Sequence, residues 1–170
     1  MNSFTENNGS PPELQQNLEL LNDLSFFSSF PAKAIKLIAY LSERDTFAPG
    51  DILFEEGDDY GQAYLVLTGQ LVLFEKLGDS KEEVKFFDPG DFLGSLSLLG
   101  SMPSLYSLQA KTDCTVLTIS RAQLAKIFEQ FPKTLNQAVQ ATINNLHQWE
   151  RKNIQRKDLL SQRSVGATVL

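Results

Sequence analysis

The segment from Phe92 to Ala110 contains the residues whose types and spacing are best suited to binding a ligand. It reads FLGSLSLLGSMPSLYSLQA, in which a Gly-Ser pair opens a short apolar turn of helix, followed by a proline and a strand. Backbone N–H groups at the start of a helix favour anions. Yet between Phe86 and Ala110 the only charged residues are Asp88 and Asp91. The segment therefore has the pattern of an anion-binding loop without a cation.

Residues for catalysis or metal binding are scarce. The chain has one cysteine, Cys114, and one histidine, His147. A single cysteine excludes an internal disulfide and a cysteine-based zinc site, and His147 alone cannot build a metal site or a catalytic triad. Cys114 lies in the alternating apolar run TDCTVLTIS, which predicts a buried thiol. We expect no enzymatic activity, no metal and no cofactor.

The composition is that of an acidic globular protein. Hydrophobic residues make up 42% of the 170-residue chain, and its formal net charge is −6. This balance disfavours nonspecific binding to nucleic acid. A third of the cations nevertheless lie near the C-terminus, at Arg151, Lys152, Arg156, Lys157 and Arg163. They indicate either the solvated face of a helix, which we favour, or a basic docking patch.

The N-terminal region carries no targeting signal. Residues 1–13 are polar and predict a disordered arm. They have neither the basic start nor the apolar centre of a signal peptide. No apolar run in the chain approaches the length of a membrane span. We therefore expect a cytoplasmic protein.

The middle of the chain has a β pattern that follows two helices. Apolar spacing predicts helices over Glu13–Leu24 and Pro31–Ser42. From Asp45 to Ser120, about eight short strands alternate with turns, which indicates a sandwich or jelly roll. The turn APGDIL recurs as DPGDFL, and the repeat predicts two equivalent corners in a roll of two sheets.

Helical periodicity returns after Ser120. The segment SRAQLAKIFEQFP begins with a serine cap and ends near Pro132, and a longer helix is expected from Lys133 to about Ser161. The long helix carries an apolar stripe that should pack on a partner. The stripe consists of Leu135, Val139, Ile143, Leu146 and Ile154, with Trp149 at its edge.

Three segments together resemble the cyclic-nucleotide-binding domain of catabolite-activator-type regulators and kinase regulatory subunits. They are FAPGDILFEEGDDYGQAYLVLTGQLVLFE, FFDPGDFLGSLSLLGSMPSLYSLQA and CTVLTISRAQLAKIF, in that order and spacing, and the resemblance covers roughly residues 20–150. It implies an α+β, mainly β fold: a double-stranded β-helix, or jelly roll, of about eight antiparallel strands between N- and C-terminal helices. We assign residues 14–150 to this domain and residues 151–170 to a basic helix end and flexible tail.

The resemblance identifies the loop as the phosphate-binding cassette of that family. There, a Glu after the glycine binds the ribose 2′-hydroxyl and an Arg after the proline binds the cyclic phosphate. Here Ser95 follows Gly94, and Ser104 follows Pro103. Leu105 and Tyr106 also stand where the family favours small residues such as alanine. Ser107 keeps the hydroxyl that in the family often contacts the phosphate or the base, and Leu96 would keep the apolar wall. We call residues 94–107 the cassette.

The two serines predict weak nucleotide binding. Removing one half of a buried charge pair costs about 2–5 kcal/mol, which lowers affinity by roughly two or more decades. Three interpretations remain: a structural corner filled by Leu105 and Tyr106, a site for a neutral or apolar ligand, or residual weak nucleotide binding. We favour the first.

The resemblance also implies how the domain works. In the family the long helix pairs with its copy, so we expect a homodimer. The segment KDLLSQRSVGATVL that follows is too short for a helix-turn-helix reader, so we expect no DNA-binding domain. We expect a non-enzymatic scaffold or adaptor that acts on an unidentified protein partner. The alternative is a sensor of a small ligand, or a weak sensor of cyclic nucleotide, that regulates a partner through its C-terminal helix.

Overall fold

The computed structural model describes residues 12–78 and 80–165, with side chains described to residue 151 except at position 149. The helices in this part of the chain are α1 (Glu13–Asp23), the 3₁₀ turn η1 (Ser25–Phe27), α2 (Ala32–Leu41), α3 (Ser95–Leu99), α4 (Arg121–Gln130) and α5 (Lys133–Val165). The strands are β1 (Glu43–Phe47), β2 (Ile52–Phe54), β3 (Gln62–Thr68), β4 (Leu71–Leu77), β5 (Ser80–Phe87), β6 (Phe92–Leu93), β7 (Ser107–Ala110) and β8 (Cys114–Ser120).

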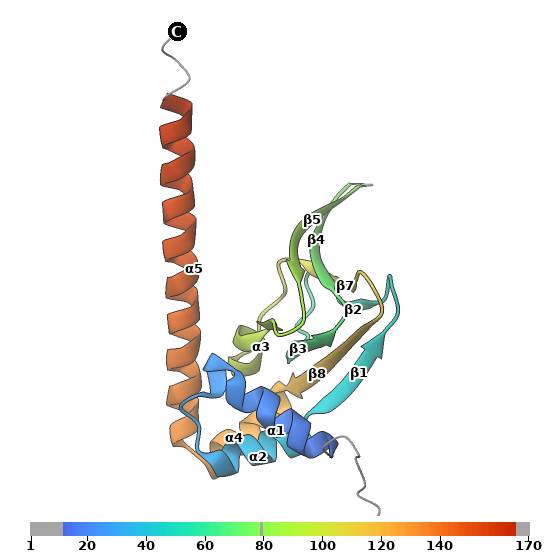
Figure 1. Cartoon of the computed structure of the whole chain (residues 1–170), viewed down its shortest axis with the longest axis vertical. Coiled ribbons are helices and arrows are strands. Elements are labelled where there is room, and N and C mark those ends of the chain that lie inside the picture. Colours follow the sequence, from blue (N-terminus) through green and yellow to red (C-terminus); the bar gives the residue numbers. More distant parts are fainter. Residues whose placement is uncertain (1–11, 79, 166–170) are drawn as a thin grey trace, which may run out of the picture.

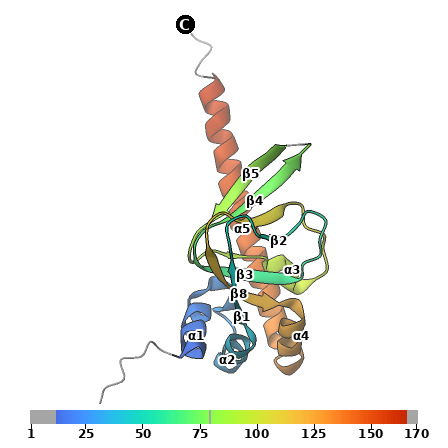
Figure 2. The ribbon, with the colours of Figure 1, turned by 90° about the vertical axis from the view of Figure 1, so that its right-hand side faces the viewer.

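The strands form two four-stranded antiparallel sheets. One sheet has the order β1-β8-β3-β6 and the other β2-β7-β4-β5. Figure 1 shows them curled into a roll, with the helices of the N-terminal region and α4 at one end. Figure 2 shows the β4–β5 hairpin projecting from the roll beyond the other strands. The jelly roll with flanking helices that we expected is confirmed.

The two PGD turns are equivalent, as predicted. Asp51 and Asp91 each accept a hydrogen bond on the side chain from the backbone N–H three residues earlier, at 2.8 Å in both turns. A third turn, Glu55–Asp58, has the same bond at 2.9 Å, although its sequence is EEGD. The aspartate and the glycine before it, with positive φ in all three turns, therefore define this corner more than the proline does.

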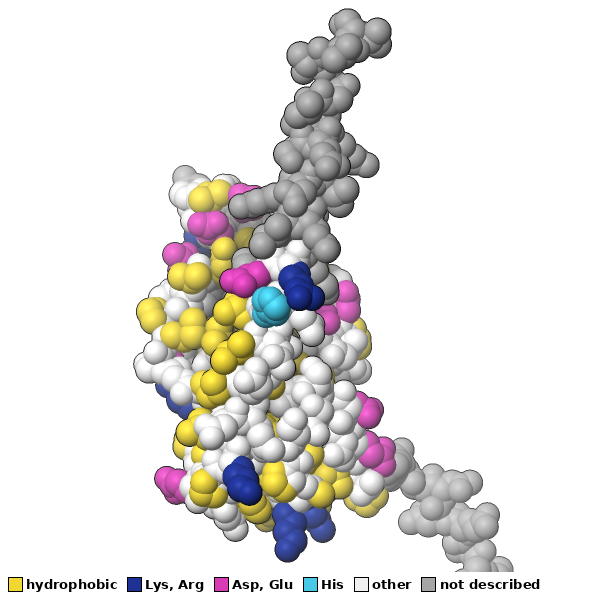
Figure 3. All heavy atoms as spheres, turned by 90° about the vertical axis from the view of Figure 1, so that its left-hand side faces the viewer, with side chains coloured by type: hydrophobic (Ala, Val, Ile, Leu, Met, Phe, Trp, Pro, Cys, Tyr) yellow, Lys and Arg dark blue, Asp and Glu magenta, His cyan; other side chains and the backbone are white. Residues whose placement is uncertain are grey.

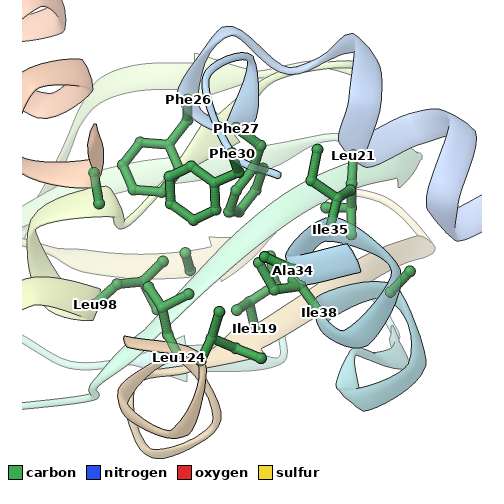
Figure 4. Close-up of a cluster of buried hydrophobic side chains, with 14 of the residues drawn as sticks. Leu21, Phe26, Phe27, Phe30, Ala34, Ile35, Ile38, Leu98, Ile119 and Leu124 are labelled. Atoms are coloured by element: carbon green, nitrogen blue, oxygen red, sulfur yellow. The ribbon is translucent and has the colours of Figure 1, made fainter. Parts of the chain in front are cut away.

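One core cluster joins the helices to the sheet that contains β3 and β8. Phe26 of η1 packs edge-to-face on Phe27, with ring centroids 4.9 Å apart. Figure 4 shows these rings beside Leu98 of α3 and Leu124 of α4, with Ile38 of α2 close by. Leu98 is 2% exposed, so the cassette helix is anchored in the same core as α2 and α4.

A second core cluster fills the inside of the roll. Phe54 and Tyr60 stack with centroids 3.8 Å apart and planes 3° from parallel, and Tyr64 lies next to both. Burial raises the pKa of the Tyr64 phenol, whose hydroxyl donates to Gln62 at 2.7 Å. Cys114 is buried in this cluster, as the sequence predicted. Aromatic rings thus occupy much of the interior between the sheets.

The two C-terminal helices begin where the sequence indicated. Ser120 caps α4 and forms a capping box with Gln123, in which the Ser120 hydroxyl accepts from the Gln123 N–H at 3.2 Å. Helix α5 starts at Lys133 and continues to Val165, a few residues past the expected end near Ser161. It stands beside the roll and extends well beyond it (Figure 1). Residues 166–170 and 1–11 lie outside the described residues.

Candidate functional site

The cassette begins with a glycine that no other residue can replace without strain. Gly94 has φ +88°, a left-handed conformation that L side chains rarely adopt. A Cβ at this position would lie 2.5 Å from the carbonyl oxygen of Gln62 and 2.9 Å from the Cα of Ala63. The chain can therefore pass close to β3 and enter α3 only because residue 94 has no side chain.

The first substituted position, Ser95, is the first residue of α3. Its side chain is half-buried and hydrogen-bonds to no described residue. Leu96 follows it and is 48% exposed. The apolar wall expected from Leu96 is therefore partly open to solvent, whereas Leu98 is buried in the core and anchors the helix there.

The second substituted position, Ser104, uses its hydroxyl within its own turn. The hydroxyl donates to the Tyr106 carbonyl at 2.6 Å and accepts from the Tyr106 N–H at 3.3 Å. The Ser104 backbone forms two hydrogen bonds with the loop before β3. Its carbonyl oxygen accepts from the Gly57 N–H, and its N–H donates to the Asp58 carbonyl oxygen, at 2.8 Å each. Ser104 is therefore part of a stable turn, and its polar group is already occupied.

The expectation that Leu105 fills the site is wrong. Leu105 is 73% exposed, and Tyr106 is half-buried. The physical reason is that β7 starts at Ser107 and not at Leu105, so the in-and-out alternation of the strand does not reach Leu105. Ser107 itself is buried, and its hydroxyl accepts from the Glu56 N–H at 3.0 Å.

A cation does contact the cassette, but it comes from α4. Arg121 donates from Nε to the Ser97 carbonyl oxygen at 2.6 Å. Its two terminal nitrogens donate to the two carboxylate oxygens of Asp59, and the Nη1–Oδ2 distance is 3.0 Å. The Asp59 carboxylate also accepts from the Ser101 hydroxyl at 2.5 Å and from the Met102 N–H at 3.4 Å.

This ion pair perturbs both groups, and the sequence did not predict it. The hydrogen bonds from Arg121, and next those from Ser101, hold the pKa of Asp59 well below its usual range. The Asp59 carboxylate in turn raises the pKa of Arg121. Asp59 lies in the segment EEGDDYG, and Arg121 follows the Ser120 cap. Nothing local in either segment indicates that they meet.

Asp88 and Asp91, the two aspartates that precede the cassette in the sequence, are engaged elsewhere. Asp91 accepts from the Asp88 N–H in the turn described above. The Asp88 carboxylate accepts from the Gln70 side chain at 2.8 Å. Each of these carboxylates therefore has a hydrogen-bond donor within the roll.

The apolar stripe of α5 is exposed along its described part. Leu135, Val139, Ile143 and Leu146 are 39–52% exposed. Their neighbours on the adjacent face, among them Ala138 and Thr142, are buried. Figure 3 shows hydrophobic side chains gathered along one side of the α5 face, beside a wide area of uncharged polar groups. The side chains of Trp149 and Ile154, which we also assigned to the seam, lie outside the described residues.

The described part of the chain contains neither a metal cluster nor a membrane-spanning helix. Among the side chains that the structure describes, in residues 12–78, 80–148, 150 and 151, no three of His, Cys, Asp or Glu gather in a way that could hold a metal ion. Within the same residues, no helix combines the length and apolar character needed to cross a membrane.

Comparisons with known proteins agree on the nature of the roll. A cAMP-dependent protein kinase regulatory subunit from Colletotrichum orbiculare is 34% identical over 90 residues, which are 53% of this chain and 22% of that protein. The structure of a cyclic nucleotide-binding-like protein from Brucella abortus matches with a TM-score of 0.62 and 28% identity, over 67% of this chain and 98% of that one.

A third match shows the fold alone. The regulatory subunit of a cAMP-independent protein kinase A from Trypanosoma brucei matches with a TM-score of 0.65 and 21% identity, over 85% of this chain and 51% of that one. Residues 44–131, just over half of the chain, match the family described as the cyclic nucleotide-binding domain. With its roll, its glycine-led cassette and these matches, the chain belongs to the cyclic nucleotide-binding domain family.

Proposed function

We propose that this domain is a non-enzymatic regulatory module that acts through protein–protein contacts, as a homodimer joined along α5. We propose further that it binds cyclic AMP and cyclic GMP no more tightly than about 10 μM, roughly −6.8 kcal/mol. Its output passes to another protein, and it works in the cytoplasm. The chain spans about a fifth of the kinase regulatory subunit that it resembles, so the identity of the partner is a separate question.

The exposed stripe on α5 is the observation that carries the proposal. Four large apolar side chains at spacings of three and four residues lie on one face, and each is 39–52% exposed. A monomeric protein seldom leaves such a contiguous apolar row facing water, because burying it against a partner is favourable. Two copies of α5 packed along this row would cover it on both chains.

The cassette supports the second half of the proposal. A cyclic phosphate carries a full negative charge, and burying it without a cation leaves much of the desolvation cost uncompensated. Ser95 and Ser104 carry no charge, and Asp59 already pairs with Arg121. The kinase regulatory subunit from Trypanosoma brucei, named as cAMP-independent, shares this fold. We infer that here too the roll serves a role that does not need the cyclic nucleotide.

The intact backbone of the cassette supports a second function. Gly94 keeps its left-handed conformation, and α3 remains anchored through Leu98. A neutral small ligand could bind such a frame through backbone N–H groups and bias α5, which would make the domain a sensor. The kinase regulatory subunit that matches is named as cAMP-dependent, so weak cyclic nucleotide is the first ligand to test.

Calorimetry tests the proposed weak binding of cyclic nucleotide, and sedimentation tests the proposed homodimer. Titration with cyclic AMP and cyclic GMP should give no dissociation constant below about 10 μM. Tighter binding would support the sensor and overturn the scaffold. Analytical ultracentrifugation at micromolar concentration should show a dimer, and a monomer would overturn the assignment of α5 as the dimer seam.

A further inference from the structure

The Asp59 carboxylate lies among donors from two separate segments, in the manner of a bound anion. The two terminal nitrogens of Arg121 donate to its two oxygens, one of them at 3.0 Å. The Ser101 hydroxyl donates to it at 2.5 Å and the Met102 N–H at 3.4 Å. A guanidinium that donates from two nitrogens, together with a hydroxyl and a backbone N–H, is a set of donors that suits phosphate as well as carboxylate.

Arg121 is held in place by contacts that do not involve Asp59. Its Nε donates to the Ser97 carbonyl oxygen at 2.6 Å, and its backbone N–H donates to the Gly61 carbonyl oxygen at 2.8 Å. The guanidinium also lies against Gly61, where an added Cβ would be 3.3 Å from its central carbon. The donors should therefore stay in position when the carboxylate is removed, which lowers the cost of binding another anion there.

The cluster is accessible to solvent, and its charge balance depends on the anion. The side chains of Arg121 and Asp59 are 28% and 34% exposed. Hydrogen bonds from Arg121, and next from Ser101, hold the pKa of Asp59 well below its usual range, which shows how strongly the cluster favours a negative charge. Asp59 is the only ion-pair partner of Arg121 among the residues that the structure describes. Loss of the carboxylate would therefore leave a partly desolvated cation without a counterion.

We propose that Arg121, Ser101 and Met102 form an oxyanion site that Asp59 occupies as an internal ligand. When the carboxylate withdraws, the same donors bind a phosphate dianion from solution. Asp59 is thus the competitor that keeps the site closed. The two cassette positions that carry serine in place of the family charges take no part in this site.

Tethering explains why the wild-type protein keeps its own carboxylate in the site. A linked group competes at an effective concentration on the order of millimolar. An external anion has to exceed that concentration to displace Asp59. Phosphate is the best-suited competitor, because it carries about two negative charges and at least three acceptor oxygens that can meet the guanidinium, the hydroxyl and the N–H together.

NMR titration of Asp59→Ala with inorganic phosphate tests the proposal. We expect saturable shifts of the Arg121 Nε–H signal and of the backbone amide signals of Ser101 and Met102. The affinity for phosphate should be at least about tenfold higher than that of the wild-type protein, in which the carboxylate competes. Sodium chloride at equal ionic strength should cause no saturable shift of these signals.

Matched variants separate this site from a general gain of positive charge. Glu55→Ala removes the acid of the exposed Lys76–Glu55 ion pair and should give no saturable phosphate shift. Asp59→Ala with Arg121→Lys keeps the charge but loses the two-pronged donor, so it should bind phosphate less tightly than Asp59→Ala. Asp59→Ser takes the place of Asp59→Ala if the alanine variant does not fold. No gain of phosphate affinity in the Asp59 variant, or an equal gain in Glu55→Ala, would overturn the proposal.

Discussion

Arg121 and Asp59 form a two-pronged ion pair that joins the start of α4 to the loop before β3. The same two side chains hold the cassette at two points: Arg121 binds the Ser97 carbonyl in the middle of α3, and Asp59 binds the Ser101 hydroxyl and the Met102 N–H just after the helix. The charges that position the cassette are thus internal to the protein. A domain built in this way can keep its cassette in place when no ligand is bound.

Breaking this pair should loosen the cassette. In Arg121→Ala, the Ser97 carbonyl loses its donor and Asp59 loses its ion-pair partner, so we expect faster hydrogen–deuterium exchange at residues 95–104. The matched control is Lys76→Ala, which breaks the exposed ion pair with Glu55 at 3.1 Å and should leave exchange in the cassette unchanged. Equal exchange in wild type and Arg121→Ala would show that the core contacts of Leu98 suffice.

The stabilising effect of Asp59 should persist over a wide pH range. The pKa of Asp59 is lowered in the folded protein, chiefly by Arg121. In the unfolded chain an Asp carboxyl has its ordinary pKa of about 3.9. A lowered carboxyl pKa contributes stability that is complete above the unfolded pKa and is lost as the pH falls towards the folded one. The difference in unfolding free energy between wild type and Asp59→Asn should therefore be constant from about pH 5 to 8 and shrink below about pH 4. Urea denaturation across this range measures it, and a difference that falls between pH 8 and 5 would contradict the assignment.

Two glycines of the cassette should differ sharply in their response to alanine. Gly94→Ala places a Cβ 2.5 Å from a backbone oxygen in a left-handed conformation, so we expect a loss of at least about 1–3 kcal/mol in the free energy of unfolding. Gly100 has extended backbone, and a Cβ added there would have no neighbour within 4 Å, so Gly100→Ala should lie within about 0.5 kcal/mol of wild type. Chemical denaturation measures the free energy of unfolding of both variants, and equal losses in the two would contradict the prediction.

Restoring the two family charges should restore affinity for cyclic nucleotide. Leu105 is exposed to solvent and does not fill the site, so Ser95→Glu with Ser104→Arg adds the missing groups to a frame that is still in place. We expect the double variant to bind cyclic AMP at least tenfold more tightly than wild type does, since lacking one half of a buried charge pair costs about 2–5 kcal/mol of binding free energy. Calorimetry of the double variant measures this affinity. An affinity no higher than that of wild type would indicate that the aromatic interior of the roll, rather than missing charge, prevents binding.

Charges on the apolar row of α5 should dissociate the dimer. Ile143→Glu with Leu146→Glu places two carboxylates on the exposed apolar face, and we expect a monomer by analytical ultracentrifugation. Asn144→Glu adds one carboxylate to the polar groove that α5 forms with η1 and should leave the dimer intact. If Asn144→Glu dissociates the dimer and the double variant does not, the seam lies on the polar face instead.

The sequence by itself determined the features that depend on near neighbours. The Ser120 cap, the PGD turns and the start of α5 were predicted because each is made by hydrogen bonds or apolar spacing over three or four residues. The family pattern added the roll and the place of the cassette. The loss of both cassette charges at Ser95 and Ser104 could likewise be read directly from the residue types.

Only the tertiary structure decided how the cassette is held and which side chains it exposes. Arg121 and Asp59 are 62 residues apart, and their meeting depends on the packing of α4 against the roll. The exposure of Leu105 depends on β7 starting at Ser107, two residues further along the chain. Short-range patterns specify which hydrogen bonds a segment can make with itself, whereas contacts between distant segments arise only when the whole roll closes and brings their polar groups within reach.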